Sequence, residues 1–337
     1  MGTTVYPLTF EPVFRDYVWG GRRLETLYGR ALPPGIVAES WEISGHASSP
    51  TRVDVGPLQG RTLPQVLDVW GLDLVGTHSA AMLARGRFPI LVKLLDANQP
   101  LSVQVHPDDA YAGEHEHGEL GKSEMWHVLH ADPGAELIYG LAEGVTCESF
   151  VRALEAGTLE SQLRRVRVRA GDSVYVPAGT VHALLAGTVV AEIQQNSDTT
   201  YRVYDWGRVG PDGKPRPLHV AQALDVINWG SQAPEIVRPR PVEVGAGFVR
   251  RELVRTEPFV VELVELAAGA TYHGECTGAS FELWGCVQGA ASVSSAHGEA
   301  ALPAVRFCVL PAALGAYTVR ATRACACLRA YFAAPRS

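Results

Sequence analysis

LSVQVH, residues 101–106, alternates apolar and polar side chains without a break. Successive side chains of a β-strand point to opposite faces, so the leucine and the two valines share one face, while Ser102, Gln104 and His106 share the other. Two structures fit this pattern: an ordinary half-exposed strand, or a strand whose polar face lines a cavity. Taken alone, the segment favours the ordinary strand.

Short apolar segments separated by Gly and Pro continue on both sides of residues 101–106, which predicts a mainly β fold of sandwiches or barrels. The spacing of Thr62 and Gln65 predicts the start of a helix. Further helices are expected at 146–156 and 219–228, and a basic run at 164–169 is expected at a solvated helix end. The expected strands of this first part are 88–95, 101–106, 124–129, 136–139, 173–176, 189–195 and 201–204.

A linker is predicted at Ser231–Pro241, which holds three prolines and few apolar residues. The 337 residues are also too many for one small core. We therefore expect a first domain at residues 1–234, with helical insertions, and a second β domain at residues 235–337. Expected strands of the second domain are 248–253, 259–266, 280–287, 290–294, 306–310, 317–320 and 325–332.

Composition excludes several classes of protein. The net charge of −7 argues against a nucleic-acid binder, which usually carries a basic balance. No stretch approaches the roughly 18 uncharged apolar residues of a membrane span. The first ten residues lack the pattern of a signal peptide, so we expect a cytoplasmic protein. The six cysteines contain no C-x-x-C pair and are expected to be small buried thiols.

Two further segments bring possible metal ligands. Glu124 starts an apolar strand, and the segment 171–182 runs a strand into a Pro/Gly turn that ends at His182. With Gln104 and His106 they offer oxygen and nitrogen ligands that suit Zn²⁺, Fe²⁺ or Mn²⁺. The wide spacing is weaker evidence than a local motif, but a β-barrel site would have it because its ligands come from different strands.

Four blocks of the sequence closely resemble one known family, the type I mannose-6-phosphate isomerases in their short bacterial form. The blocks are PLSVQVHPDDAYA (100–112), GKSEMWHVL (121–129), GDSVYVPAGTVHAL (171–184) and AEIQQNSDTTYRVYDWGR (191–208). Segments 8–24, 39–46 and 251–266 resemble the same family, so the resemblance covers most of the chain in order.

The resemblance implies a specific active site. Gln104, His106, Glu124 and His182 match the positions that hold a single Zn²⁺ ion, and Arg202 matches an active-site arginine. The implied activity is zinc-dependent aldose–ketose isomerisation, interconverting mannose 6-phosphate and fructose 6-phosphate through an enediol.

The resemblance also implies a fold: two cupin-type (jelly-roll) β-barrels with a few short helices inserted. The first barrel would be catalytic, and the second would hold no metal because its His273 and His297 stand alone. The expected partner is a small sugar phosphate, with neither nucleic acid nor membrane, and the expected state is a monomer or homodimer.

Three residues are candidates for catalysis, each with a plainer alternative. Lys122 would contact a phosphate or hydroxyl group, or would be a surface lysine. Glu192 would be the base or a structural carboxylate. Arg202 would meet charge in the active site, or would pair with Asp198 or Asp205.

Two other functions are compatible with such a chain. One is another metal-cupin enzyme, such as an iron oxygenase acting on a small polar substrate. The other is a non-catalytic sugar-phosphate sensor, against which the intact ligand set and Arg202 argue.

Overall fold

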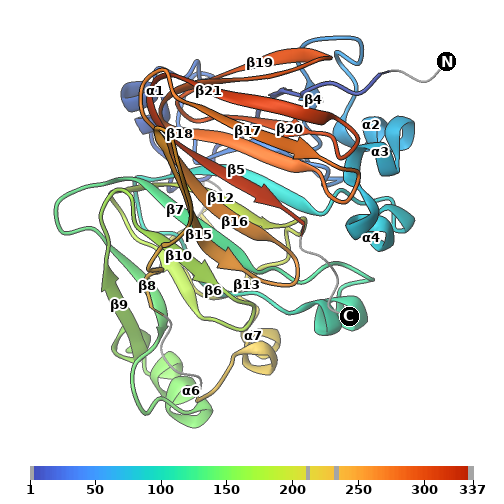
Figure 1. Ribbon diagram of the computed structural model, residues 1–337. Coiled ribbons are helices and arrows are strands. Elements are labelled where there is room, and N and C mark those ends of the chain that lie inside the picture. Colours follow the sequence, from blue (N-terminus) through green and yellow to red (C-terminus); the bar gives the residue numbers. More distant parts are fainter. Residues whose placement is uncertain (1–3, 210–212, 231–234, 333–337) are drawn as a thin grey trace. The chain divides into compact units, whose positions relative to one another are not determined.

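The structure, a computed structural model, describes residues 4–209, 213–230 and 235–332 (Figure 1). It is mainly β with a few short helices, as the sequence predicts. The chain divides into two compact units. The catalytic-side unit comprises Arg15–Glu39 and Leu95–Ile236, and the C-terminal unit comprises Met1–Phe14, Ser40–Leu94 and Val237–Ser337. The linear division at residues 234 and 235 stays a prediction, and residues 231–234 of the expected linker lie outside the described part.

The helices are short, and their starts follow sequence signals where these exist. Thr62 caps its helix with a capping box: its side chain accepts from the Gln65 N–H, and the Gln65 side chain accepts from the Thr62 N–H. Among the described helices, none combines the length and hydrophobicity that a membrane crossing requires. The helices are α1 Arg23–Tyr28, α2 Leu63–Trp70, α3 Leu72–Val75, η1 Thr77–Ser79, α4 Ala80–Ala84, α5 Asp109–His115, α6 Cys147–Glu155, η2 Leu159–Gln162 and α7 Val220–Val226.

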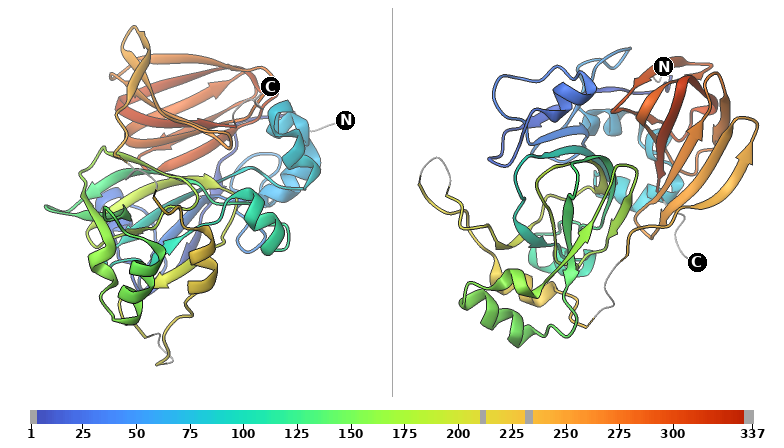
Figure 2. Two further views of the ribbon diagram at one scale, coloured as in Figure 1. Left: turned by 90° about the horizontal axis from the view of Figure 1, so that it is seen from below. Right: turned by 90° about the vertical axis from the view of Figure 1, so that its left-hand side faces the viewer.

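Two groups of antiparallel strands build the catalytic-side unit. One has the order β10-β7-β12 and the other the order β13-β6-β11-β8-β9. Side chains from β7, β8, β10, β11 and β12 join in one buried cluster, so the two groups pack face to face (Figure 2). Their bounds are β6 Val103–Val105, β7 Glu124–Ala131, β8 Glu136–Leu141, β9 Leu163–Arg167, β10 Ser173–Val176, β11 His182–Leu184, β12 Thr188–Gln195 and β13 Tyr201–Tyr204.

The polar face of β6 is turned inward between these two groups. Its apolar face, Val103 and Val105, packs in a second cluster with Phe150 of α6 and Ala223 of α7. Because helices cover the apolar face, the polar side chains of β6 occupy the interior. The reading of 101–106 as an ordinary half-exposed strand is therefore wrong, because every residue of the segment except half-buried Gln104 is buried.

The basic run is also placed differently from the expectation. Arg164, Arg165 and Arg167 lie in β9, which pairs with β8, rather than at a helix end. The strand ladder satisfies the backbone here, while Arg165 forms ion pairs with Glu136 and Glu160 at the surface. Arg164 and Val166 are half-buried whereas Arg165 and Arg167 are exposed, which is the alternation of an edge strand.

An extended antiparallel sheet dominates the C-terminal unit, with the order β14-β15-β16-β21-β18-β19, β17 beside β21 and β20 beside β18 (Figure 1). The expected strands 280–287 and 290–294 are one strand, β18, and the expected strands 317–320 and 325–332 are one strand, β21. The pairing of β18 with β21 shifts register near Cys286 and Gln288. These strands are β14 Arg240–Gly245, β15 Phe248–Arg255, β16 Val260–Leu266, β17 Thr271–Cys276, β18 Glu282–Ser295, β19 Gly298–Pro303, β20 Arg306–Leu310 and β21 Gly315–Tyr331.

Residues from the start of the chain belong to this same unit. Leu8 forms a β-bridge with Val309, and Arg306 pairs with Asp54. The remaining strands are β1 Phe10–Glu11, β4 Arg52–Val53, and β2 Val13–Arg15, β3 Glu39–Ile43 and β5 Ile90–Ala97, the last three crossing a unit boundary along the chain.

Candidate metal centre

Three side chains with metal-ligating atoms converge between the two strand groups of the catalytic-side unit. The ligating atoms of His106, Glu124 and His182 all lie within 4.8 Å of one another. His106 Nε2 is 3.1 Å from one oxygen of Glu124, and His182 Nε2 is 3.8 Å from the other. Each side chain is at most 1% exposed. The sequence therefore identified a set that the fold brings together.

Both imidazoles are held in the same tautomer by main-chain carbonyl groups. His106 Nδ1 is 2.8 Å from the Thr199 carbonyl oxygen, and His182 Nδ1 is 2.8 Å from the Thr180 carbonyl oxygen. A carbonyl oxygen only accepts, so each Nδ1 carries the hydrogen and each Nε2 lone pair faces Glu124. This is the arrangement that orients histidines as ligands in metal sites.

The electrostatics keep the histidines neutral and the glutamate ionised. Burial lowers the pKa of His106 to about 3, with the charge of Lys122 as a further cause, and burial also lowers the pKa of His182. Burial opposes ionisation of Glu124, yet the charge of Lys122 holds its pKa well below the usual range. Neutral histidines and an ionised glutamate are the forms that bind a metal ion, so these three side chains need not release a proton when the ion binds.

Glu124 is under-satisfied for a buried carboxylate. Lys122 Nζ lies 2.8 Å from one of its oxygens, but neither oxygen accepts a well-directed hydrogen bond within the described part of the chain. Buried carboxylates are normally fully hydrogen-bonded or coordinate a metal. The geometry thus fits a cation at the point where the three side chains meet.

Gln104 completes the group on the strand next to His182. The two residues are partners in the β6–β11 ladder. The Gln104 side-chain nitrogen lies 3.5 Å from His106 Nε2 and 3.4 Å from His182 Nε2, longer than normal hydrogen bonds. Its oxygen accepts from the Ser102 hydroxyl at 3.3 Å. The side chain therefore reaches the centre, with its amide group directed at both imidazoles.

Two glycines allow the loops that deliver Lys122 and His182. A side chain at Gly121 would collide with the backbone of Asp108, so glycine lets this loop lie against the start of α5. Gly179 has φ of +82° in the turn before His182, and a side chain there would meet Asn228. The G-K and P-x-G features of the sequence thus have a local steric cause.

Lys122 and Arg202 both lie beside this centre. Lys122 is buried, with Nζ 3.3 Å from His106 Nε2, so it is no surface lysine. Arg202 stands opposite Gln104 in the β13–β6 ladder, and its Nε donates to Ser102 at 3.1 Å. Asp205 pairs with Arg208 and Arg216 instead of Arg202.

Glu192 lies on the same face of the β7–β12 ladder as Glu124, one cross-strand pair further along on that face. It is opposite Trp126 in the β12–β7 ladder, just as Gln194 is opposite Glu124. Its side chain is buried and accepts a hydrogen bond from Trp126 Nε1 at 2.9 Å. Trp126 in turn stands edge-on to His182, with ring centroids 5.4 Å apart. Glu192 is thus linked to the centre through one indole.

Sequence reasoning missed the groups that orient the ligands. Thr199 and Thr180 act through their carbonyl oxygens, which no side-chain pattern reveals. Trp126 was detectable, because it follows Glu124 by two residues and must share its face. Ser102 was noted on the face of Gln104, but its bonds to Gln104 and Arg202 emerge only from the fold.

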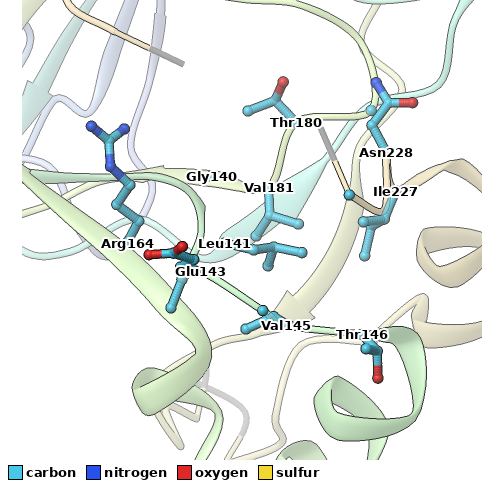
Figure 3. Close-up of a pocket in the computed structure, with 14 residues that line it drawn as sticks. Gly140, Leu141, Glu143, Val145, Thr146, Arg164, Thr180, Val181, Ile227 and Asn228 are labelled. Carbon is cyan, nitrogen blue, oxygen red and sulfur yellow. The ribbon is translucent and has the colours of Figure 1, made fainter. Parts of the chain in front are cut away.

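A separate cavity of about 720 Å³ lies beside the turn before His182 (Figure 3). Thr180, Val181, Arg164 and Asn228 are among its lining residues. None of the seven candidate site residues is among the described residues that line it. The cavity therefore adjoins the backbone that positions His182 but is not the centre itself.

Comparisons with known proteins identify the family of the chain. Residues 8–132 match the model of the phosphomannose isomerase type I catalytic domain. A probable mannose-6-phosphate isomerase of Bacillus subtilis (GmuF) is 39% identical over 319 residues, covering 94% of this chain and 97% of the relative. The chain belongs to the type I mannose-6-phosphate isomerase family. It is an enzyme of this family, as the four sequence blocks predict.

Other mannose-6-phosphate isomerases match as well. The mannose-6-phosphate isomerase ManA of Bacillus subtilis is 43% identical over 224 residues, covering 66% of this chain and 69% of the relative. A crystal structure of a Bacillus subtilis mannose 6-phosphate isomerase superposes with a TM-score of 0.85 at 33% identity, covering 96% of this chain and 99% of the other. The fold class expected from the sequence is confirmed by this match.

Proposed function

We propose that this enzyme interconverts mannose 6-phosphate and fructose 6-phosphate with one divalent metal ion, zinc by preference. The observation that carries the proposal is the buried convergence of His106, Glu124 and His182, with both Nε2 lone pairs aimed at a carboxylate that lacks well-directed donors. Membership of the type I family supplies the choice of substrate.

Four residues would hold the metal. His106 and His182 offer Nε2, Glu124 offers a carboxylate oxygen, and Gln104 offers its amide oxygen. The two ends of an amide have nearly the same shape, so half a turn of the Gln104 amide group presents oxygen to the centre. Ser102 Oγ then accepts from the amide nitrogen instead of donating to the oxygen. Mixed nitrogen and oxygen ligands with open positions suit catalytic zinc.

The chemistry needs stabilisation of negative charge and a carrier for a proton. Isomerisation moves a proton between C1 and C2 through an enediol, with charge building on the attached oxygens. A bound divalent ion would polarise these oxygens. Arg202, fixed by Ser102, would stabilise the same charge from the side of β13. Lys122 would contact a substrate hydroxyl or phosphate oxygen, and Glu192 would carry the proton.

A coupled assay with mannose 6-phosphate tests the proposal, with metal analysis of the same preparation. We expect about one metal ion per chain, loss of turnover with a chelator and recovery with zinc. His106→Ala and His182→Ala should each weaken metal binding by about 10-fold or more, because each removes a direct ligand. Full activity in protein with almost no bound metal would end the metal hypothesis.

His127 provides a matched control for these variants. It lies on β7 like Glu124 but on the opposite face, buried, with Nδ1 3.0 Å from the Ser173 hydroxyl. His127→Gln should therefore keep the metal and the turnover number while losing some stability. Bound iron with oxygen consumption, and no fructose 6-phosphate, would instead favour the metal-cupin oxygenase.

The state and location of the enzyme complete the proposal. We propose a monomer or homodimer in the cytoplasm, acting on a soluble sugar phosphate. Analytical ultracentrifugation at the concentration of the assay distinguishes the two states. A larger assembly would refute this part of the proposal and leave the catalytic part untouched.

A further inference from the structure

Three cysteines meet on one face of the sheet in the C-terminal unit, which contains none of the residues assigned to catalysis. Cys286 of β18 is directly opposite Cys327 of β21. Cys325 precedes Cys327 by two residues on β21 and so points to the same face. The S–H of Cys286 donates to the Gln288 carbonyl at 3.2 Å, and the three thiols lie close enough that each shifts the pKa of the other two. All three thiols are free.

The three thiols differ in their access to solvent. Cys286 and Cys327 are fully buried, whereas Cys325 is 6% exposed. Cys325 also lines an open surface cavity of about 540 Å³, together with Phe248, Leu266 and Gln288. A small molecule entering this cavity therefore meets Cys325 before either of the other thiols.

The surroundings of Cys325 favour a thiolate. Hydrogen bonds from Cys286 and Cys327 lower its pKa to about 4, and the backbone N–H of Leu266 adds to this. Burial instead raises the pKa of Cys308, a cysteine of the same unit, to about 12. Thiolates react with oxidants and buried thiols are inert, so the chain holds both kinds in one sheet.

Register also selects the pair that a disulfide would join. Directly opposite residues of antiparallel strands have Cα atoms about 4.5–5.5 Å apart, within the range of about 4.4–6.8 Å that disulfides span. Cys286 and Cys327 occupy such positions. Cys325 is offset along β21, which suits an entry point better than the final bond.

We propose that Cys325, Cys286 and Cys327 form a peroxide-reactive site whose end product is a Cys286–Cys327 disulfide. In the first step the Cys325 thiolate attacks a hydroperoxide, an S–O bond forms and the O–O bond breaks. The released alkoxide, or hydroxide from hydrogen peroxide, takes a proton from water. The product is a sulfenic acid at Cys325.

Two further steps complete the oxidation. The Cys286 thiol displaces the sulfenic oxygen, giving a Cys325–Cys286 disulfide and one water. Cys327 then attacks Cys286 Sγ, loses its proton to solvent and releases the Cys325 thiolate, which is the better leaving group because of its lower pKa. Overall, two thiols are oxidised and one hydroperoxide is reduced to an alcohol and water.

The test uses the full chain with Cys147→Ser, because Cys147 is a partly exposed thiol elsewhere. The reduced protein is treated with hydrogen peroxide, denatured and alkylated, then mapped by mass spectrometry. We expect two of the five remaining cysteines to resist alkylation and a peptide pair joining Cys286 to Cys327. Adding Cys325→Ser should slow this at least tenfold, whereas adding Cys308→Ala should not change it.

A second measurement keeps the proposal testable if Cys325→Ser does not fold. A dimedone-type probe for sulfenic acids is added to the Cys147→Ser protein at early times. It should label Cys325 first. First labelling of Cys286 or Cys327, an unchanged rate in Cys325→Ser, or five cysteines that all remain alkylatable would each overturn the proposal.

Discussion

Arg202→Ala is expected to keep its metal and to lose turnover. In the structure two of the guanidinium N–H groups are used inside the protein: Nε donates to Ser102 at 3.1 Å and Nη1 donates to the Pro217 carbonyl at 3.0 Å. These bonds fix the guanidinium beside Gln104, its ladder partner. The remaining N–H groups of the fork are then available to a substrate oxygen.

The size of the effect follows from those remaining donors. A hydrogen bond to a charged group contributes about 1.5–3 kcal/mol. If one such bond is made only in the transition state, its loss lowers kcat by about 10- to 150-fold, since about 1.4 kcal/mol is a factor of ten. Removal of charge-stabilising groups often costs about 10²-fold or more, so we expect a fall near 10²-fold. Arg202→Lys should recover little, because an ammonium lacks the planar fork.

The assay separates two uses of the guanidinium. Loss of a transition-state contact lowers kcat, whereas loss of uniform substrate binding raises KM and spares kcat. Metal analysis of Arg202→Ala confirms that the centre is intact. Near-normal kcat with a raised KM would refute the reasoning and make Arg202 a phosphate clamp, and the search for the charge-stabilising group would move to Lys122.

Four further outcomes are expected. Glu192→Gln keeps an acceptor for the indole but cannot carry a proton, so kcat in the coupled assay should fall by about 10²-fold or more; near-normal turnover would exclude Glu192 as the proton carrier. Burial lowers the pKa of His127 to about 4, so the unfolded chain takes up this proton first as pH falls below 6.5, and stability falls with it. Urea unfolding should show up to about 3 kcal/mol lost through His127 towards pH 4, and a non-titrating His127→Gln that kept the full slope would contradict this. Arg329→Leu leaves buried Glu282 without its ion-pair partner and removes one of the two arginines that pair with Glu262, so it should cost about 3–5 kcal/mol in the same unfolding assay; a neutral effect would show that the ion pairs contribute little. His273→Ala, at an exposed position of the C-terminal unit, should leave turnover within a few-fold, and a collapse in kcat with the fold intact would disprove the structural role.

Much of the centre could be predicted because its residues obey the simplest rule of a strand. Gln104 and His106 share a face by alternation. Gly121 and Gly179 mark turns shortly before Glu124 and His182. What alternation could not give is the side of the strand that faces inward. The inward side is decided by α6 and α7, which cover the valines of β6. These helices are far from β6 in the sequence.

The sequence also could not predict that β18 is one continuous strand. The sequence predicts two strands here, 280–287 and 290–294, separated by Gln288 and Gly289. In the structure the ladder with β21 continues across register shifts beside Gly289, whose φ is +79°. A bulge looks like a turn in the sequence because both use glycine, and only the pairing partner distinguishes them.

The polar interiors of the two units differ in where the positive charge comes from. At the candidate centre two imidazole lone pairs and two carboxylate oxygens converge, and Lys122 alone contributes a buried cation there within the described residues. The acceptors outnumber the donors, so an added cation is favourable.

In the C-terminal unit the guanidinium of Arg329 supplies that cation. It forms ion pairs with Glu262 at 2.9 Å and Glu282 at 2.6 Å, while Trp284 Nε1 donates to Glu282 at 3.0 Å. Arg250 forms a second ion pair with Glu262, and the Tyr317 hydroxyl donates to Glu282, so these carboxylates are satisfied as Glu124 is not. This supports the prediction that the unit holds no metal. Two arginines, Arg329 and Arg250, therefore balance the two carboxylates of Glu262 and Glu282, which leaves no net charge among these four residues for a metal ion to balance.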